Sequence, residues 1–66
     1  MLGTTIKKYI DDKGLKQQKV AMDAGLTAQQ LSDICCERRK VDALEYFRIC
    51  KALDVDLDYF ARQVEA

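Results

Sequence analysis

Basic side chains are the residues whose types and spacing most clearly suggest a chemistry, namely the binding of phosphate groups. Arg38, Arg39 and Lys40 are consecutive and form the strongest cationic cluster in the chain. Residues 1–40 hold eight Lys/Arg and five Asp/Glu, whereas residues 41–66 hold three and six, although the formal net charge is zero. Because the local field steers a polyanion, the sequence predicts one basic end and one acidic end. A chance division of a charge-rich surface is the alternative.

Residue types that catalysis or metal binding would need are scarce. The chain has no histidine, no glycine-rich phosphate loop and no nucleophile beside a base, so we expect no enzymatic activity and no cofactor. Cys35 and Cys36 are adjacent and Cys50 stands apart, a spacing that suits neither a zinc site nor a disulfide framework. We expect reduced thiols, with Cys36 exposed, and no small-molecule substrate.

Composition favours a helical protein inside the cell. The 66 residues are 48% hydrophobic and include no proline. Apolar runs are far shorter than the roughly 20 residues of a membrane-spanning helix, so we expect a cytoplasmic protein with no membrane partner. A chain of this size buries only about 60% of its unfolded surface, so a dimer interface would add useful stability.

Hydrophobic periodicity predicts one all-α domain over residues 1–66. Leu2, Ile6 and Ile10 recur every four residues, and Asp42 and Asp56 have the side-chain chemistry to cap later helices. The expected helices cover about 4–13, 17–24, 28–37, 42–53 and 56–64. The side chains that the last two should bury are Ala43, Tyr46, Phe47, Ile49, Cys50, Leu53, Leu57, Phe60 and Val64.

The segment 17–34 has the pattern of two helices joined by a tight corner. Ala21 is small where steeply crossed helices would approach closely. Gly25 suits the left-handed residue that ends a helix, and Thr27 has the oxygen to cap the next one. We therefore predict a helix-turn-helix, with helices at roughly 90–120°. An ordinary helical hairpin is the alternative.

These positions resemble the helix-turn-helix family of the phage lambda repressor and Cro, without a gap from about residue 6 to residue 60. The matching residues are Gly14, Leu15, Gln17, Ala21, Gly25, Leu26, Thr27, Leu31, Ser32, Ile34, Ile49, Lys51, Ala52, Leu53, Val55, Leu57 and Asp58. The resemblance implies a compact five-helix fold and a bacterial or phage-type, nucleoid-associated transcriptional regulator that binds double-stranded DNA. Its third helix, 28–37, would be the recognition helix in the major groove.

The loop after the third helix departs from the family pattern. The family usually has Glu at position 35 and Gly at position 37, where this chain has Cys35 and Glu37. It often has a polar residue at the position of Cys36 and a proline or similar residue at that of Val41. These changes concern the loop and its phosphate contacts, and they leave the core pattern intact.

In a docked recognition helix, the first two turns on one face meet base edges. This selects Thr27, Ala28, Gln29, Gln30, Ser32 and Asp33. Gln29 is the best candidate because its amide can pair with adenine N6 and N7. Ala28 could touch a thymine methyl, and Asp33 could accept from cytosine N4 or exclude a nearby phosphate. A solvated helix surface is the alternative for Gln29 and Gln30.

Phosphate contacts should come from both sides of the recognition helix. The expected residues are Lys16, Gln17, Lys19, Arg38, Arg39 and Lys40. Proteins of this type bind paired half-sites as dimers, so a homodimer, at least on DNA, is expected. Its interface would use Leu44, Leu57, Tyr59 and Phe60, although Leu44 could instead pack against residues near a terminus.

A second function remains open. The acidic residues 41–66 and the altered loop also suit a protein-interaction module of the same fold, such as an adaptor or an antitoxin-like partner.

Overall fold

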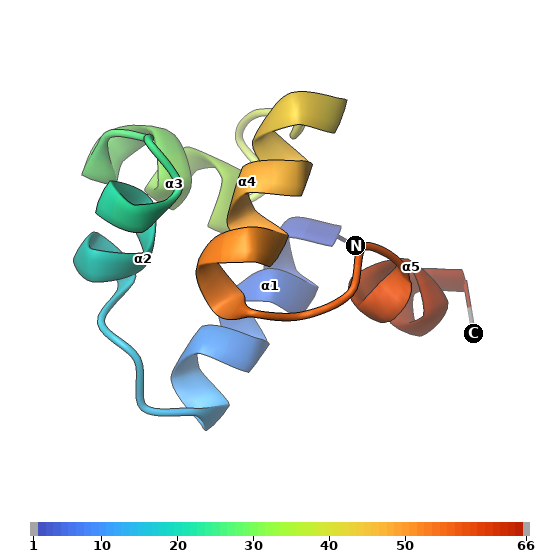
Figure 1. Ribbon diagram of the computed structural model, residues 1–66. Helices are drawn as coiled ribbons and strands as arrows, with labels where there is room; N and C mark the ends of the chain where they lie inside the picture. Colours follow the sequence, from blue (N-terminus) through green and yellow to red (C-terminus); the bar gives the residue numbers. More distant parts are fainter. Residues whose placement is uncertain (1, 66) are drawn as a thin grey trace.

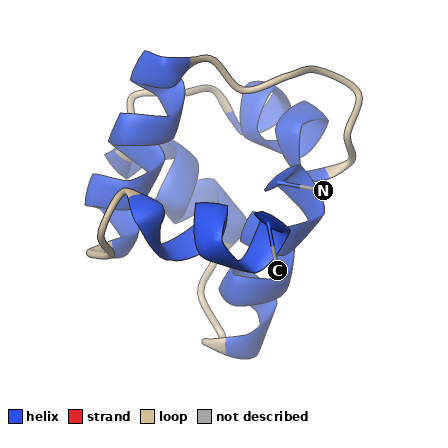
Figure 2. Ribbon diagram, turned by 90° about the vertical axis from the view of Figure 1, so that its right-hand side faces the viewer, coloured by secondary structure: helices blue, strands red, loops and turns tan. Residues whose placement is uncertain are grey.

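The computed structural model describes residues 2–65, apart from the side chain of Glu65. Five helices are present, and no strand occurs in this part of the chain (Figure 2). They are α1 (Leu2–Asp12), α2 (Gln17–Asp23), α3 (Ala28–Cys35), α4 (Ala43–Leu53) and α5 (Asp58–Glu65). Figure 1 shows α2 and α3 on one side, α5 on the other, and α1 and α4 between them. The predicted all-α class is confirmed.

The first four helices end in the same way. In each, a residue with positive φ follows the last turn: Gly14, Gly25, Glu37 and Asp54, with φ of 67°, 72°, 62° and 58°. Two backbone hydrogen bonds then close each end, as in the Schellman motif. The glycine ends at 14 and 25 match the prediction. The ends at Glu37 and Asp54 do not use glycine.

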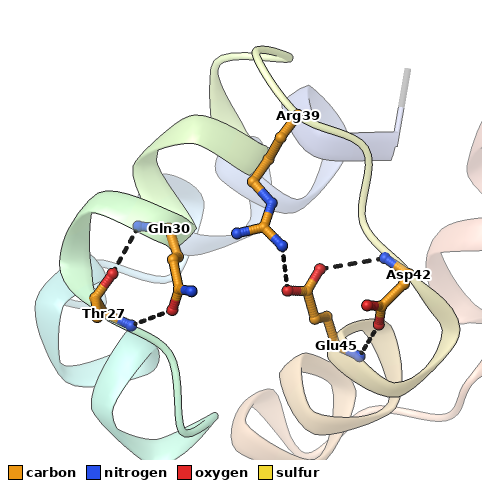
Figure 3. Close-up of polar contacts among 5 residues, drawn as sticks. All are labelled: Thr27, Gln30, Arg39, Asp42 and Glu45. Carbon is orange, nitrogen blue, oxygen red and sulfur yellow. Dashed lines mark hydrogen bonds and ion pairs between the residues drawn. The ribbon is translucent and has the colours of Figure 1, made fainter.

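Capping boxes start α3 and α4, at the two cap residues that the sequence predicts. The Thr27 hydroxyl accepts from the Gln30 N–H at 3.0 Å, and the Asp42 carboxylate accepts from the Glu45 N–H at 2.8 Å (Figure 3). In both cases the third helical residue accepts the cap's own backbone N–H in return. Local side-chain chemistry therefore fixes where these two helices begin.

Three helix ends differ from the predicted ranges by two residues, and the others agree to within one. The first helix begins at Leu2, and its first turn packs against α3 at Gly3, as described below. The third ends at Cys35, since Glu37 is already left-handed. The fifth begins at Asp58, so Asp56 lies one residue before the position of its cap. Its entrance is instead tied to α4, because the Tyr46 hydroxyl donates to the Leu57 carbonyl.

The core takes residues from all five helices, with one from α5. α1 packs against α3 and α5, and α2 packs against α3 and α4. Phe60 is fully buried, and the rings of Tyr9, Tyr46 and Tyr59 meet it edge-on. The buried apolar residues are Ile6, Ile10, Val20, Ala21, Ala24, Leu26, Leu31, Ile34, Cys35, Ile49, Cys50, Leu53 and Phe60.

Several side chains predicted to be buried are exposed. The buried stripe of α4 runs through Glu45, Ile49, Cys50 and Leu53, so Ala43 and Phe47 face outward. On α5 only Phe60 is fully enclosed, and Leu57 and Val64 are exposed. The buried faces predicted for these two helices are wider than the observed ones.

Contact between α1 and α3 sets the position of α3. A Cβ added to Gly3 would lie 1.9 Å from the Ile34 carbonyl oxygen, so only glycine permits this approach. Beside it, the Thr4 N–H donates to Glu37 Oε2 at 2.8 Å. The N-terminal turn of α1 is thereby joined to the loop that leaves α3, which we call the exit loop (residues 36–42).

Candidate nucleic-acid interface

The corner between α2 and α3 is held from within. Ala21 is buried, and its carbonyl accepts from the Ala24 N–H at 3.2 Å and the Leu26 N–H at 2.8 Å. Gly25 turns the chain in the left-handed conformation, and Leu26 anchors the corner in the core. The predicted helix-turn-helix is confirmed, and Thr27 is the N-cap of α3.

The outer face of α3 carries all the residues predicted to read bases. Leu31, Ile34 and Cys35 are buried against the body of the molecule. The opposite face is polar or small: Thr27, Ala28 and Gln29 are exposed, and Gln30, Ser32 and Asp33 are half-buried. α3 thus presents side chains that can hydrogen-bond to base edges, and no large apolar residue lies among them.

Asp33 is the centre of the polar contacts on this face. Its Oδ1 accepts from Gln29 Nε2 at 2.8 Å and from Arg38 Nε at 3.1 Å. The hydrogen bonds from Arg38 and Gln29 hold the pKa of the Asp33 carboxyl below its usual value. The carboxyl in turn raises the pKa of the Arg38 guanidinium. Asp33 therefore stays ionised beside a matched cation.

Thr27 and Gln30 are occupied by the capping box. The Gln30 side-chain oxygen accepts from the Thr27 N–H at 2.8 Å, while the Thr27 hydroxyl accepts from the Gln30 N–H (Figure 3). The hydroxyl hydrogen of Thr27 and the amide hydrogens of Gln30 remain as donors. Their acceptor groups, by contrast, already serve the start of α3.

The predicted phosphate-binding residues differ in how they are used. Lys19 pairs with Asp23 at 3.2 Å, and both side chains are exposed. None of the described carboxylates lies within 4.0 Å of the Lys16 or Lys40 ammonium. Gln17 is half-buried at the first position of α2. Among the predicted phosphate-binding cations, Lys16 and Lys40 are therefore the most open to a phosphate.

Arg39 has a structural partner that the sequence did not reveal. Its guanidinium pairs with Glu45 Oε2 (Figure 3). Glu45 is only 9% exposed, and its other oxygen accepts from the Asp42 N–H at 3.2 Å. The pair joins the exit loop to the first turn of α4. A Glu three residues after Asp42 was the available signal, since it completes a capping box.

Three of the four residues predicted to form a dimer interface, which we call the dimer patch, are exposed. Leu44 is 56% exposed, and Leu57 and Tyr59 are also exposed. Phe60, in contrast, is 0% exposed and belongs to the core, so its assignment to the patch is wrong. Phe47 is exposed one turn after Leu44, with Lys51 Nζ 5.4 Å from its ring centre. The sequence does not place Phe47 in the patch, because its pattern predicts that Phe47 is buried.

The thiols lie as expected: Cys36 is exposed, whereas Cys35 and Cys50 are buried. Burial raises the pKa of both buried thiols. In the described part of the chain, no three His, Cys, Asp or Glu residues are grouped to hold a metal ion. No helix described here is long and apolar enough to cross a membrane.

Comparison with known proteins agrees with this geometry. The structure is similar to the crystal structure of the clp gene regulator ClgR from C. glutamicum, with a TM-score of 0.90 and 20% sequence identity. The similarity covers 97% of this chain and 83% of that one. Among curated protein sequences, none matches. The Helix-turn-helix family model matches residues 6–60, the same span as the sequence resemblance. The chain therefore belongs to the helix-turn-helix family of the Cro and lambda repressor type, a family of DNA-binding transcription regulators.

Proposed function

We propose that this protein is a small sequence-specific regulator of the repressor or Cro type, with α3 as its recognition helix. The outer face of α3 is the observation that supports this most strongly, because it presents Gln29 and Ser32 beside small side chains. An α-helix of this kind fits the major groove, where base pairs can be told apart. Gln29 would pair with adenine, Ala28 would contact a thymine methyl, and Thr27 would donate from its hydroxyl.

Phosphate binding would come from residues on both sides of α3. Lys16, Gln17 and Lys19 lie at or near the start of α2, and Lys40 lies in the exit loop with no described acidic partner. Arg38 and Arg39 add positive charge, although each already has a carboxylate partner. Such contacts fix the orientation on the duplex and carry no sequence information by themselves.

A homodimer on DNA completes the proposal. Leu44 and Phe47 are exposed on one face of α4, and Leu57 and Tyr59 are exposed at the α4–α5 junction and on α5. A second copy covering such a surface would place two recognition helices on half-sites about 34–36 Å apart. The interface residues in this proposal are Leu44, Phe47, Leu57 and Tyr59.

The second candidate is a protein-interaction module. The exposed Leu44 and Phe47 favour it, because an apolar helix face beside acidic residues can also accept a different protein. The polar outer face of α3 would then have no role in recognising bases.

Two measurements distinguish the regulator from the interaction module. Bound duplexes are selected from a random pool, and fluorescence anisotropy then measures the affinity of the protein for them. With about five or six phosphate contacts per subunit, log K should fall linearly with log salt, with a slope of about −5 for each bound subunit. Lys40→Ala should make this slope less steep by about one, and it should weaken binding to all duplex sequences alike. Gln29→Ala should instead change the preference at one base pair.

Lys8→Ala is the matched control, since Lys8 is an exposed lysine of α1 paired with Asp12 at 2.7 Å. Arg39 is a poor test residue because its loss would leave Glu45 unpaired. Absence of duplex binding, or equal effects of Lys40→Ala and Lys8→Ala, would refute the regulator and favour the interaction module.

A further inference from the structure

Two donors from different parts of the chain meet at one oxygen atom on the outer face of α3. Asp33 Oδ1 accepts from Gln29 Nε2, one turn earlier, and from Arg38 Nε in the exit loop. The Asp33 backbone carbonyl also accepts from the Arg38 N–H at 2.8 Å and from the Arg39 N–H at 3.3 Å. Asp33 is thus bonded to the exit loop through both backbone and side chain, and it is well placed to hold Gln29.

We infer that Asp33 is a positioning residue that sets the orientation of the Gln29 amide, rather than a residue that reads a base. This inference rests on the proposed function. One amide hydrogen of Gln29 is used by Asp33, which fixes which end of the amide is nitrogen and which is oxygen. The second amide hydrogen and the oxygen remain for adenine N7 and N6, the two-bond pairing that selects this base.

Arg38 makes this arrangement compatible with DNA. An ionised carboxylate near the phosphate backbone would be repelled, and the adjacent guanidinium offsets that charge. The Asp33 side chain is 29% exposed, and that of Arg38 is 59% exposed. Because the Arg38 guanidinium already pairs with Asp33, Arg38 should contribute less than Lys40 to the salt dependence of DNA binding.

The test is the ratio of affinities for two duplexes that differ only at the base pair where Gln29→Ala loses its preference. Asp33→Ala removes the acceptor, and the ratio should fall by about tenfold. Asp33→Asn keeps a side-chain oxygen that can accept from Gln29, so most of the ratio should return. Both variants remove the same negative charge, so a change in overall phosphate affinity cannot produce this difference.

Asp58→Ala is the structural control, because Asp58 on α5 forms a similar exposed pair with Arg62 at 2.8 Å. It should leave the ratio unchanged. In the double variant Gln29→Ala/Asp33→Ala, the ratio should equal that of Gln29→Ala alone, since Asp33 acts through Gln29.

Two results would overturn the inference while leaving the proposed function intact. One is an unchanged ratio in Asp33→Ala. The other is a loss of preference at a second base pair in Asp33→Ala, independent of Gln29, which would make Asp33 itself a base reader. Absence of any duplex binding by the unaltered chain is a different outcome, and it would refute the proposed function on which the inference rests.

Discussion

Glu37 combines an unfavourable backbone conformation with a useful hydrogen bond. Its φ of 62° is a value that glycine adopts without steric cost, and the family pattern expects glycine there. The side chain that glycine lacks accepts the Thr4 N–H and so joins α1 to the exit loop. The departure from the family pattern therefore keeps the usual helix end and adds a tertiary contact.

Comparison of two glycine substitutions tests this interpretation. Asp54 has the same left-handed conformation at the end of α4, so Asp54→Gly should raise the free energy of unfolding by about 0.5–1 kcal/mol. Glu37→Gly should give a smaller gain or a loss, because it also removes the bond to Thr4. Urea denaturation measures both, and equal gains would show that the Thr4 contact contributes nothing.

The pKa of Asp33 reports the contact with Arg38. The folded-state pKa of Asp33 lies below the ordinary value of an aspartate, so the pair's contribution to stability is present above the unfolded-state pKa. It is lost as the pH falls through the folded-state pKa. Arg38→Met should move the pKa upward, toward its ordinary value, in a carboxyl ¹³C NMR titration. A pKa that does not move would show that the contact is absent in solution.

At the scale of helices, the sequence predicts best where the signals are local. Thr27 and Asp42 were identified as caps and Gly25 as a helix end, because each of these roles depends on neighbouring residues. The sequence does not predict the contacts of the first turn of α1, because they involve Ile34 and Glu37, more than 30 residues away. Distant contacts of this kind leave no periodic trace in the sequence.

Gly3→Ala tests the close approach of α1 and α3. An added Cβ would meet the Ile34 backbone oxygen at 1.9 Å, and backbone cannot move aside cheaply. Overpacking of this kind should cost about 1–3 kcal/mol or more of unfolding free energy. Gly25→Ala is the comparison, since its nearest contact is Arg48 Nη1 at 3.9 Å and only backbone strain of about 1 kcal/mol arises. Similar thermal stabilities for Gly3→Ala and the unaltered chain would contradict the close packing.

At the scale of the whole molecule, the sequence predicted which face of α3 points outward but not how its side chains pair. Periodicity separates a buried face from an exposed one. The bonds of Asp33 and of Arg39 depend on the path of the exit loop, which the altered positions 35–41 made hard to anticipate. The sequence predicts Phe60 both as a buried residue and as part of the dimer patch, and Phe47 as a buried residue, because these predictions rest on approximate helix faces.

The proposed dimer predicts the effect of a charge on α4. Leu44→Asp places a carboxylate on an exposed position, so the fold should persist while self-association weakens at least tenfold. Sedimentation equilibrium, with circular dichroism as the check on folding, measures both. Met22→Asp is the control, because Met22 is also exposed but lies on α2, outside the proposed interface. Equal effects of the two variants would exclude the α4 face as the dimer interface.

The most direct test of the central claim is an amide NMR titration of the ¹⁵N-labelled protein with its selected duplex. If α3 enters the major groove, the largest shifts should fall in residues 27–33, with smaller ones in residues 16–19 and 38–40. Shifts confined to α5 and the outer face of α4, with the α3 amides unmoved, would contradict the account.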